Sequence, residues 1–376
     1  MNQRSQRQKQ QLLGQALELL NPRLPSMWSL DVVDREGGTS TPEAGARLML
    51  ELRGPSSTVA LLCVVVLVSC EPKDARSLAE EARNGQEIGS SSLPLLVVAP
   101  WFSRRSQNLF TEAKINYFDL TGNISLALNE PVFYFQAGGS DRNPEPVDQA
   151  IAQVRGAKAG RLLRFLAEVK PPYSVSELAS ATSLTAGYVS RLLETLDREA
   201  LIDRGPRGRV VRVDVVALLR RWAESYQVLR SNRANQFLAP NGIDSILKLL
   251  ATDPPVADFA ITGSFAAVRR APVAAPSLLM IYCDDAGRFS RDLALLPTER
   301  GANVVLLEPA DEGVFVDTEY EDGLPFVAPS QVVIDCLTGN GRMPAEGEAL
   351  LEWMLAHLDD WQSGSINEHL SRTLVK

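Results

Sequence analysis

Residues 174–213 read SVSELASATSLTAGYVSRLLETLDREALIDRGPRGRVVRV. Ser174 and Glu177 have the spacing of a capping box, in which a hydroxyl and a carboxylate each satisfy a free amide at a helix start. A turn follows at Ser183-Leu184, and Thr185 is of the residue type that caps a second helix. Apolar residues then recur at helical spacing and predict that one face of this second helix is buried: Val189, Leu192, Leu193 and Leu196.

The opposite face of the second helix, which we expect over residues 185–200, is small and polar in its first turns. Small residues let a helix lie deep in a major groove, where its first turns reach base edges. Polar and charged side chains there can bond to bases or phosphates. The candidate DNA-binding residues of this helix are Thr185, Ala186, Gly187, Tyr188, Ser190 and Arg191.

A basic hairpin follows. Leu201-Ile202 is a short strand, residues 204–209 form a turn that contains Gly and Pro, and residues 210–213 form the return strand. We expect three arginines at the hairpin tip to contact the phosphate backbone or a minor groove: Arg204, Arg207 and Arg209. The order of two helices and a hairpin predicts a winged helix-turn-helix that binds double-stranded DNA. A helix pair with a solvated loop, or a protein-binding module, is the alternative.

Basic charge is concentrated in the same part of the chain. Residues 151–233 hold 15 lysines and arginines against 8 acidic residues, a net charge of +7. Residues 234–376 hold 9 against 21, residues 1–150 hold 14 against 17, and the whole chain has a net charge of −8. A basic segment is typical of a nucleic-acid binder, and the acidity of the whole chain argues against indiscriminate polyanion binding.

The composition is that of an ordinary globular protein. The 376 residues are 45% hydrophobic and 22% charged, which suggests two or three domains. The longest apolar run, Val59–Val68, has ten residues, too few to span a bilayer. The N-terminus reads MNQRSQRQKQQ, with no apolar signal region behind it. We therefore expect a cytoplasmic protein, associated with the nucleoid when bound to DNA, without a membrane partner.

Metal and cofactor chemistry is not indicated by the sequence. The four cysteines have no metal-type spacing and are interpreted as reduced thiols, three of them in apolar strand-like or helix-like settings: Cys63, Cys70, Cys283 and Cys336. Only two histidines are present, His357 and His369, which leaves little for a histidine-based metal site or a Ser-His catalytic system. We predict no metal site, no cofactor and no catalytic residue.

The N-terminal part, residues 1–140, mixes strands and helices and predicts an α/β domain with a central sheet. Residues 138–146, GGSDRNPEP, have the composition of a linker. The expected helices are 12–20, 74–84 and 103–113, and the expected strands are 28–33, 46–53, 59–68, 95–99, 116–119, 124–128 and 132–136.

The rest of the chain divides into a winged helix-turn-helix domain at 150–233 and a further α/β domain at 240–365. Helices at 150–169 and 215–233 are expected to flank the winged unit, and the second could carry a dimer contact or lie along the next domain. The fold class is therefore multidomain, α/β and α+β. In the last domain the expected helices are 243–252, 265–270, 329–337 and 344–358, and the expected strands are 259–262, 278–283, 303–307 and 314–317.

The last domain resembles the nucleotidyltransferase-like domain of AbiEi-type antitoxins and related bacterial regulators. The resemblance is carried by residues 261–267 (ITGSFAA), 278–283, 301–304 and 330–335, and with the winged unit it covers roughly 155–360. It implies a DNA-binding repressor that controls its own operon. We expect a homodimer, with dimerisation set by the domains that flank the winged unit. The added N-terminal domain departs from the compact antitoxin, so a toxin-like partner stays open.

The N-terminal domain is similar to restriction-endonuclease-like domains, on LLVVAPWFS (95–103) and YFDLTGNI (117–124). Active members need an acidic residue and a Glu/Asp-x-Lys element that hold a metal ion. The nearest approach here is Asp31 with Glu51-Leu52-Arg53, and an arginine stays protonated where a catalytic lysine is needed. We expect this domain to be inactive.

A nucleotidyltransferase is the enzymatic alternative. Gly263-Ser264, between an expected strand and helix, could present amides to a nucleotide phosphate. Active members also need an Asp-x-Asp pair, because residues two apart in a strand share a face. This chain has Asp284-Asp285, which are adjacent and point to opposite sides. We therefore interpret the domain as a packing, dimerisation or ligand-sensing unit.

Overall fold

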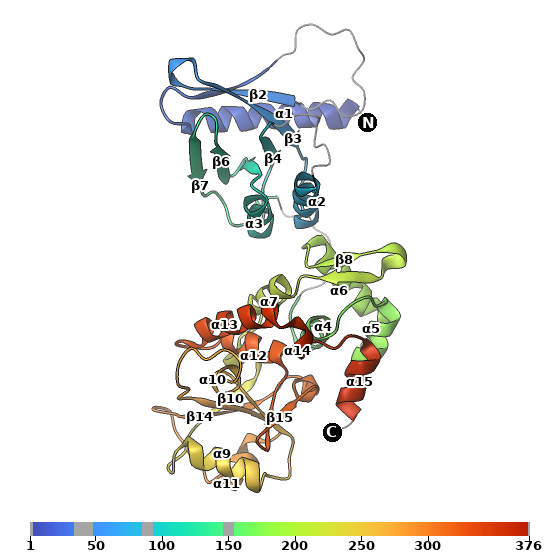
Figure 1. The fold of residues 1–376 in the computed structure, drawn as a ribbon, viewed down its shortest axis with the longest axis vertical. Coiled ribbons are helices and arrows are strands. Elements are labelled where there is room, and N and C mark those ends of the chain that lie inside the picture. The colour runs from blue at the N-terminus through green and yellow to red at the C-terminus, as the bar shows by residue number, and fades with distance from the viewer. Residues whose placement is uncertain (1–2, 34–47, 85–92, 146–153, 375–376) are drawn as a thin grey trace. The chain divides into compact units, whose positions relative to one another are not determined.

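The computed structural model describes residues 3–33, 48–84, 93–145 and 154–374. Its internal contacts divide the chain into two compact units: Met1–Ala150 with Arg198–Ala200, and Ile151–Asp197 with Leu201–Lys376. Each unit contains a seven-stranded sheet and helices (Figure 1). The prediction of a mixed α/β structure is therefore confirmed.

The sheet of the first unit has its strands in sequence order. The two neighbour pairs β3–β4 and β4–β5 are parallel, and all other neighbours are antiparallel. The strands are β1 (Ser29–Val32), β2 (Leu48–Arg53), β3 (Val59–Val66), β4 (Leu95–Ala99), β5 (Asn116–Asp119), β6 (Ile124–Leu128) and β7 (Phe133–Ala137).

Helices cover both faces of this sheet (Figure 1). Leu96 and Val98 of β4 share a buried cluster with α1 (Gln3–Leu20), whereas Val97 and Ala99 share another with α2 (Pro72–Arg83) and α3 (Arg104–Glu112). Successive side chains of a strand point to opposite faces, so a fully apolar strand is the signature of a sheet buried on both sides. The apolar sequence of β4 follows directly from this three-layer arrangement.

The second unit begins with the winged part. It consists of α4 (Ala157–Glu168), α5 (Val175–Thr182), α6 (Ala186–Arg198), β8 (Ile202–Arg204), β9 (Val210–Val213) and α7 (Val215–Ala223). The strands β8 and β9 pair antiparallel and form a two-stranded sheet of their own. Helices α5 and α6 and strands β8 and β9 lie close to the boundaries that the sequence predicts, whereas α4 and α7 are shorter than the predicted helices.

The second seven-stranded sheet has the order β13-β10-β14-β12-β11-β16-β15. The pairs β14–β12 and β11–β16 are parallel and the others are antiparallel. The strands are β10 (Arg233–Leu238), β11 (Phe259–Thr262), β12 (Leu279–Cys283), β13 (Leu296–Pro297), β14 (Val304–Glu308), β15 (Glu319–Glu321) and β16 (Leu324–Phe326).

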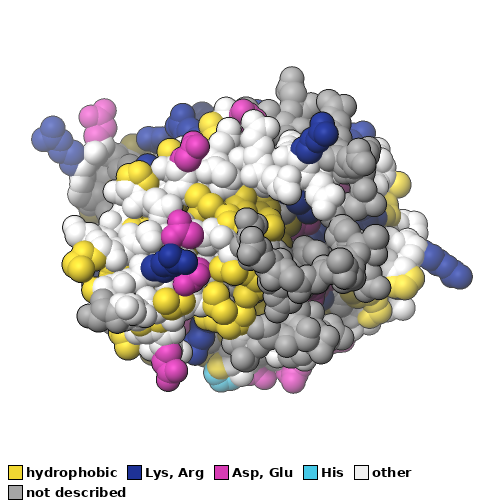
Figure 2. All heavy atoms as spheres, turned by 90° about the horizontal axis from the view of Figure 1, so that it is seen from above, with side chains coloured by type: hydrophobic (Ala, Val, Ile, Leu, Met, Phe, Trp, Pro, Cys, Tyr) yellow, Lys and Arg dark blue, Asp and Glu magenta, His cyan; other side chains and the backbone are white. Residues whose placement is uncertain are grey.

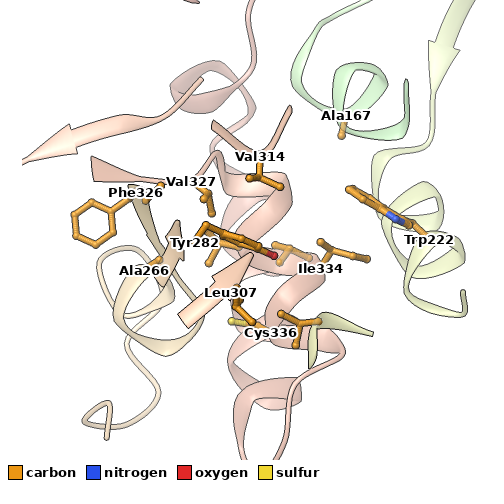
Figure 3. Packing of buried hydrophobic residues seen from close by; sticks show 14 of the residues in the cluster. Ala167, Trp222, Ala266, Tyr282, Leu307, Val314, Phe326, Val327, Ile334 and Cys336 are labelled. Carbon is orange, nitrogen blue, oxygen red and sulfur yellow. The ribbon is translucent and has the colours of Figure 1, made fainter. Parts of the chain in front are cut away.

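Helix α12 (Pro329–Leu337) joins the winged part to this sheet. It packs against α4 and α7 on one side and against β11 on the other. Figure 3 shows Ile334 of α12 and Trp222 of α7 pointing toward one another, with Tyr282 of β12 beyond them. All three belong to one continuous buried cluster that runs from α4 to the C-terminal helices. The winged part and the second sheet therefore share a core.

The remaining helices of the second unit lie on either side of the sheet (Figure 1). With α12 on one side lie α10 (Ser264–Ala267) and α13 (Met343–Ala356), and on the other side lie α9 (Ile243–Thr252) and α11 (Ala286–Asp292). Two short helices, α14 (Leu358–Trp361) and α15 (Ile366–Leu374), end the chain.

The prediction of one long helix over 215–233 is wrong. Helix α7 ends at Ala223, a short α8 (Val228–Ser231) follows, and Arg233 begins β10. The break lets Tyr226 reach into the core, where its hydroxyl donates to Asp335 Oδ1 at 2.8 Å. A buried hydrogen bond to a charged group outweighs the helix propensity of a few residues.

The prediction of a strand over 314–317 is also wrong. The chain forms a 3-10 turn, η4 (Glu312–Phe315), whose start is capped by Asp311: its side chain accepts from Gly313 N at 2.9 Å. The missed elements are α8, α11, α14, α15, and the strands β10, β13, β15 and β16. Most of them have two to seven residues, too few for a clear periodic signal, so tertiary contacts decide their structure.

Candidate nucleic-acid interface

The turn between α5 and α6 is built as the sequence predicts. Ser174 N donates to Glu177 Oε2 at 2.6 Å, and Glu177 N donates to Ser174 Oγ at 3.3 Å, so the capping box is confirmed. These bonds hold the pKa of Glu177 below its usual value. Ser183 ends α5 in the left-handed conformation, with φ of 54°. The hydroxyl of Thr185 then accepts from Tyr188 N at 3.4 Å at the start of α6.

Helix α4 is the third helix of the helix-turn-helix core. Every residue from Leu162 to Val169 is buried, and Arg161 Nη1 donates to the carbonyl of Thr182 at the end of α5, at 3.3 Å. The sequence predicts only a leading helix over 150–169, of which 150–153 lie outside the described residues. The missed signal is an apolar pattern on all sides of the helix, which indicates burial all round. Two ionisable residues of α4, Arg164 and Glu168, are buried with its apolar side chains.

Helix α6 presents the predicted face to solvent. Its apolar residues Val189, Leu192, Leu193 and Leu196 are all fully buried, which confirms the predicted core face. Of the candidate DNA-binding residues, Thr185, Ala186, Gly187 and Arg191 are exposed, and Tyr188 and Ser190 are half-buried. No acidic residue occurs from 185 to 193. The first turns of α6 thus offer small, polar and basic groups together on one accessible surface.

The three wing arginines have different surroundings. Arg207 is exposed at the tip and has a left-handed φ of 60°. Arg204 is half-buried and its Nε donates to the carbonyl of Gly208 at 3.2 Å. Arg209 is half-buried, lies 3.4 Å from Glu177 Oε2 and donates to the carbonyl of Pro172 at 3.3 Å. Arg204 and Arg209 therefore hold the wing in place, whereas Arg207 makes no ion pair within the described ranges.

Other basic residues near the winged part are mostly paired with acids. Arg212 pairs with Asp203, Arg220 with Glu348 at 2.6 Å, and Arg221 with Glu224 at 3.3 Å. On the face that Figure 2 draws, lysines and arginines likewise stand beside acidic and hydrophobic side chains. Arg191 and Arg207 differ from these three arginines of the winged part, because neither makes an ion pair within the described ranges.

The residues of the enzymatic alternative are separated by the sheet. Phe259 of β11 pairs with Cys283 of β12, and Thr262 pairs with Met280, because the strands are antiparallel. Ser264 therefore lies at the start of β12, and Asp284 lies at its opposite end, about five residues or roughly 16 Å of strand away. At the end near Ser264, β12 carries only buried apolar residues, which cannot hold metal ions: Leu279, Met280 and Ile281.

Both groups also have structural partners. Ser264 is buried, and its hydroxyl donates to Glu346 Oε2 at 2.5 Å. Asp285 caps α11 by accepting from Arg288 N at 2.9 Å. These hydrogen bonds explain the serine at 264 and the aspartate at 285 by structural roles, without a bound nucleotide.

The residues nearest to a nuclease-type element lie on the first two strands of the N-terminal unit. Asp31 of β1 lies opposite Glu51 of β2, and Arg53 pairs with Glu51 at 3.1 Å. The neighbouring strand β3 carries no charged residue. In the described parts of the chain, no three His, Cys, Asp or Glu residues lie where they could hold a metal ion together.

All four cysteines are buried, and none of them forms a disulfide within the described residues. Burial raises the pKa of Cys70 and of Cys283 to about 12. Such thiols remain protonated at neutral pH and are poor nucleophiles.

Comparison with known proteins identifies the winged part. Residues 157–206 match the IclR helix-turn-helix domain. The match spans α4, α5, α6 and the first strand of the wing, and it supports a DNA-binding transcriptional regulator. No significant match was found among curated proteins or solved structures. The resemblances to AbiEi-type antitoxins and to restriction-endonuclease-like domains stay predictions.

Among the described residues, no helix is both long and apolar enough to cross a membrane.

Proposed function

We propose that the protein is a sequence-specific DNA-binding repressor. The observation that carries this proposal is the exposed, acid-free start of α6 within a segment that matches the IclR helix-turn-helix domain. Helix α6 enters the major groove with its first turns against base edges, and the wing lies along the phosphate backbone or in the adjacent minor groove.

The candidate residues have distinct roles in this complex. Arg191 reads a base, because it is the one exposed charged side chain in the first two turns of α6. Thr185, Tyr188 and Ser190 donate to bases or phosphates, and Ala186 and Gly187 allow close approach. Arg207 contacts the backbone from the wing tip, whereas Arg204 and Arg209 act by positioning the wing.

We further propose that the protein binds as a homodimer on an inverted repeat. A single helix-turn-helix covers only a few base pairs, and two-fold dimers bind half-sites one helical turn, about 34–36 Å, apart or at multiples of that distance. The resemblance to AbiEi-type regulators supports repression of the protein's own operon. A toxin-like partner has no support in the described surface.

The experiment that tests the proposal recovers genomic DNA fragments bound by the purified protein at near-physiological salt, with competitor DNA. A shared inverted-repeat motif would establish a specific regulator and identify its targets. Salt-sensitive binding without a motif would mean a non-specific binder. No binding would favour a protein-interaction role for the winged part, and nucleotide transfer would then be assayed.

A further inference from the structure

A cavity of about 170 Å³ lies inside the second unit, between α4, α7, α8 and the segment that leads into η4. The exposed surface of its wall is more apolar than polar, and it also includes the polar residues Ser225, Tyr226, Ser231, Asn232 and Asp311. Ala157, Gly160, Arg164, Trp222, Val314 and Gln331 line the rest of it, together with Gly156 and Ala310. The cavity thus adjoins α4, and none of the residues that we assign to DNA binding lines it.

Arg164 is the notable group in this wall. Its side chain lies on α4, and the residue is only 7% exposed. Its Nε and Nη2 both donate to Gln331 Oε1, at 3.2 and 2.6 Å. Throughout the described ranges, its Nη1 donates no hydrogen bond and no carboxylate forms an ion pair with it. Burial lowers the pKa of this guanidinium, although an arginine stays charged at neutral pH.

The acidic residues nearby are already neutralised or occupied. Asp311 also borders the cavity, but Arg161 donates to it from Nη2 at 2.6 Å and from Nε at 3.2 Å. Asp335 does not bond to Arg164 directly: Gln331 lies between them, and its Nε2 donates to Asp335 Oδ1 at 2.8 Å. A buried cation without a direct counter-ion is costly, and anion binding removes that cost.

The free part of Arg164 has a defined geometry. A guanidinium has five N–H donors in one plane, and Gln331 occupies the edge formed by Nε and Nη2. The end formed by Nη1 and the second hydrogen of Nη2 remains. A carboxylate fits such a fork with two parallel hydrogen bonds.

The rest of the cavity suits a compact apolar group. The guanidinium carbon of Arg164 lies 5.8 Å from the centre of the Trp222 ring, and Val314 and Ala157 add further apolar surface to the wall. A Cβ on Gly160 would lie 3.1 Å from that ring, so the absence of a side chain lets Trp222 pack closely against α4. An apolar cavity of about 150 Å³ is large enough to bind benzene.

We propose that this cavity binds a small monocarboxylate with a ring-sized apolar body, held by its carboxylate on the free end of Arg164. The apolar body lies against Trp222 and Val314. The residues of this site line the cavity alone, so binding can be measured without DNA.

The test measures binding of benzoate, phenylacetate and cyclohexanecarboxylate, each beside its neutral primary amide, to the full chain by calorimetry and thermal shift. At least one acid is expected to bind about tenfold or more tightly than its amide, the effect of one charged hydrogen-bond pair. Arg164→Gln should remove that preference.

A second pair of variants keeps the test decisive if Arg164→Gln fails to fold. Ala157→Leu fills the cavity from the first turn of α4, whereas Lys158→Leu adds the same side chain at an exposed neighbour. Ala157→Leu should weaken the acid about tenfold or more, and Lys158→Leu should bind like the unchanged protein. The proposal is overturned if no acid binds at about 10 mM, if acids and amides bind equally, or if Ala157→Leu has no effect.

Discussion

Replacement of Arg191 by glutamine is the sharpest test of the groove assignment. Arg191 is exposed in α6, and its side chain makes no ion pair or hydrogen bond within the described ranges. Arginine and glutamine have similar helix propensities, and a surface change without partners alters stability by no more than about 0.5 kcal/mol. Any loss of DNA affinity is therefore a loss of contact with DNA.

The expected magnitude follows from the role of the residue. An arginine that reads a base with two hydrogen bonds contributes about 1–3 kcal/mol of discrimination, which corresponds to about 5- to 140-fold in Kd. The same change should weaken binding to scrambled DNA much less, because base readout is absent there. The ratio of specific to non-specific affinity should fall accordingly.

The assay is fluorescence anisotropy with a selected target duplex and a scrambled duplex, at one salt concentration. Arg300→Gln is the matched control, because it removes the same charge from an exposed position in the loop between β13 and β14. Equal weakening on both duplexes would show that Arg191 contacts phosphate only. An unchanged Kd on both would refute the placement of α6 in the groove.

Three further changes follow from the structure. Arg207→Gly should reduce the slope of log K against log salt by about 0.9 and weaken DNA binding about fivefold at about 0.15 M salt. The melting temperature should not fall, because glycine adopts the φ of 60° without strain. An unchanged slope would mean that the wing tip does not contact DNA. Ser174→Ala should destabilise the protein by about 1 kcal/mol and lower its melting temperature by about 2–4 °C. Ser180→Ala, on the exposed side of α5, should have little effect. Equal melting temperatures of the two variants would mean that the capping box adds no stability. Burial raises the pKa of Glu168 to about 7, so the folded state keeps a proton that the unfolded state releases above about 4.5. Stability should therefore fall as pH rises from about 4.5 to about 7, and Glu168→Gln should flatten this part of a plot of melting temperature against pH. If the plots of the variant and of the unchanged protein run parallel, the raised pKa is contradicted.

The helix-turn-helix could be predicted from the sequence because its signals are local. The capping box, the left-handed Ser183 and the spacing of Val189 to Leu196 each act within one or two turns. The same holds for the strands of the first sheet, whose apolar runs are bounded by turn residues. Long periodic segments determine their own secondary structure, so their placement needs little tertiary information.

The elements that could not be predicted depend on distant partners. The break after Ala223 is stabilised by Tyr226, which bonds to Asp335 more than a hundred residues away. Nothing in the local sequence indicates that partner, and the residues themselves are compatible with a helix. The different roles of the wing arginines are equally non-local, because Arg209 is distinguished from Arg207 only by its approach to Glu177 and Pro172.

The buried polar network explains why the DNA-binding part is not a free module. Arg164 of α4 bonds to Gln331 of α12, and Gln331 bonds to Asp335, which also accepts from Thr262 of β11 at 2.6 Å. The first and last of these bonds cross from one element to another, whereas the bond between Gln331 and Asp335 lies within α12. Removal of one partner would leave a buried polar group unsatisfied, which costs about 1–3 kcal/mol. A fragment that ends after α7 would expose this network together with the apolar face around Trp222. The orientation of α6 is therefore set by the same core that encloses the cavity, so a molecule bound beside Arg164 would act directly on the helix that supports the DNA-binding surface.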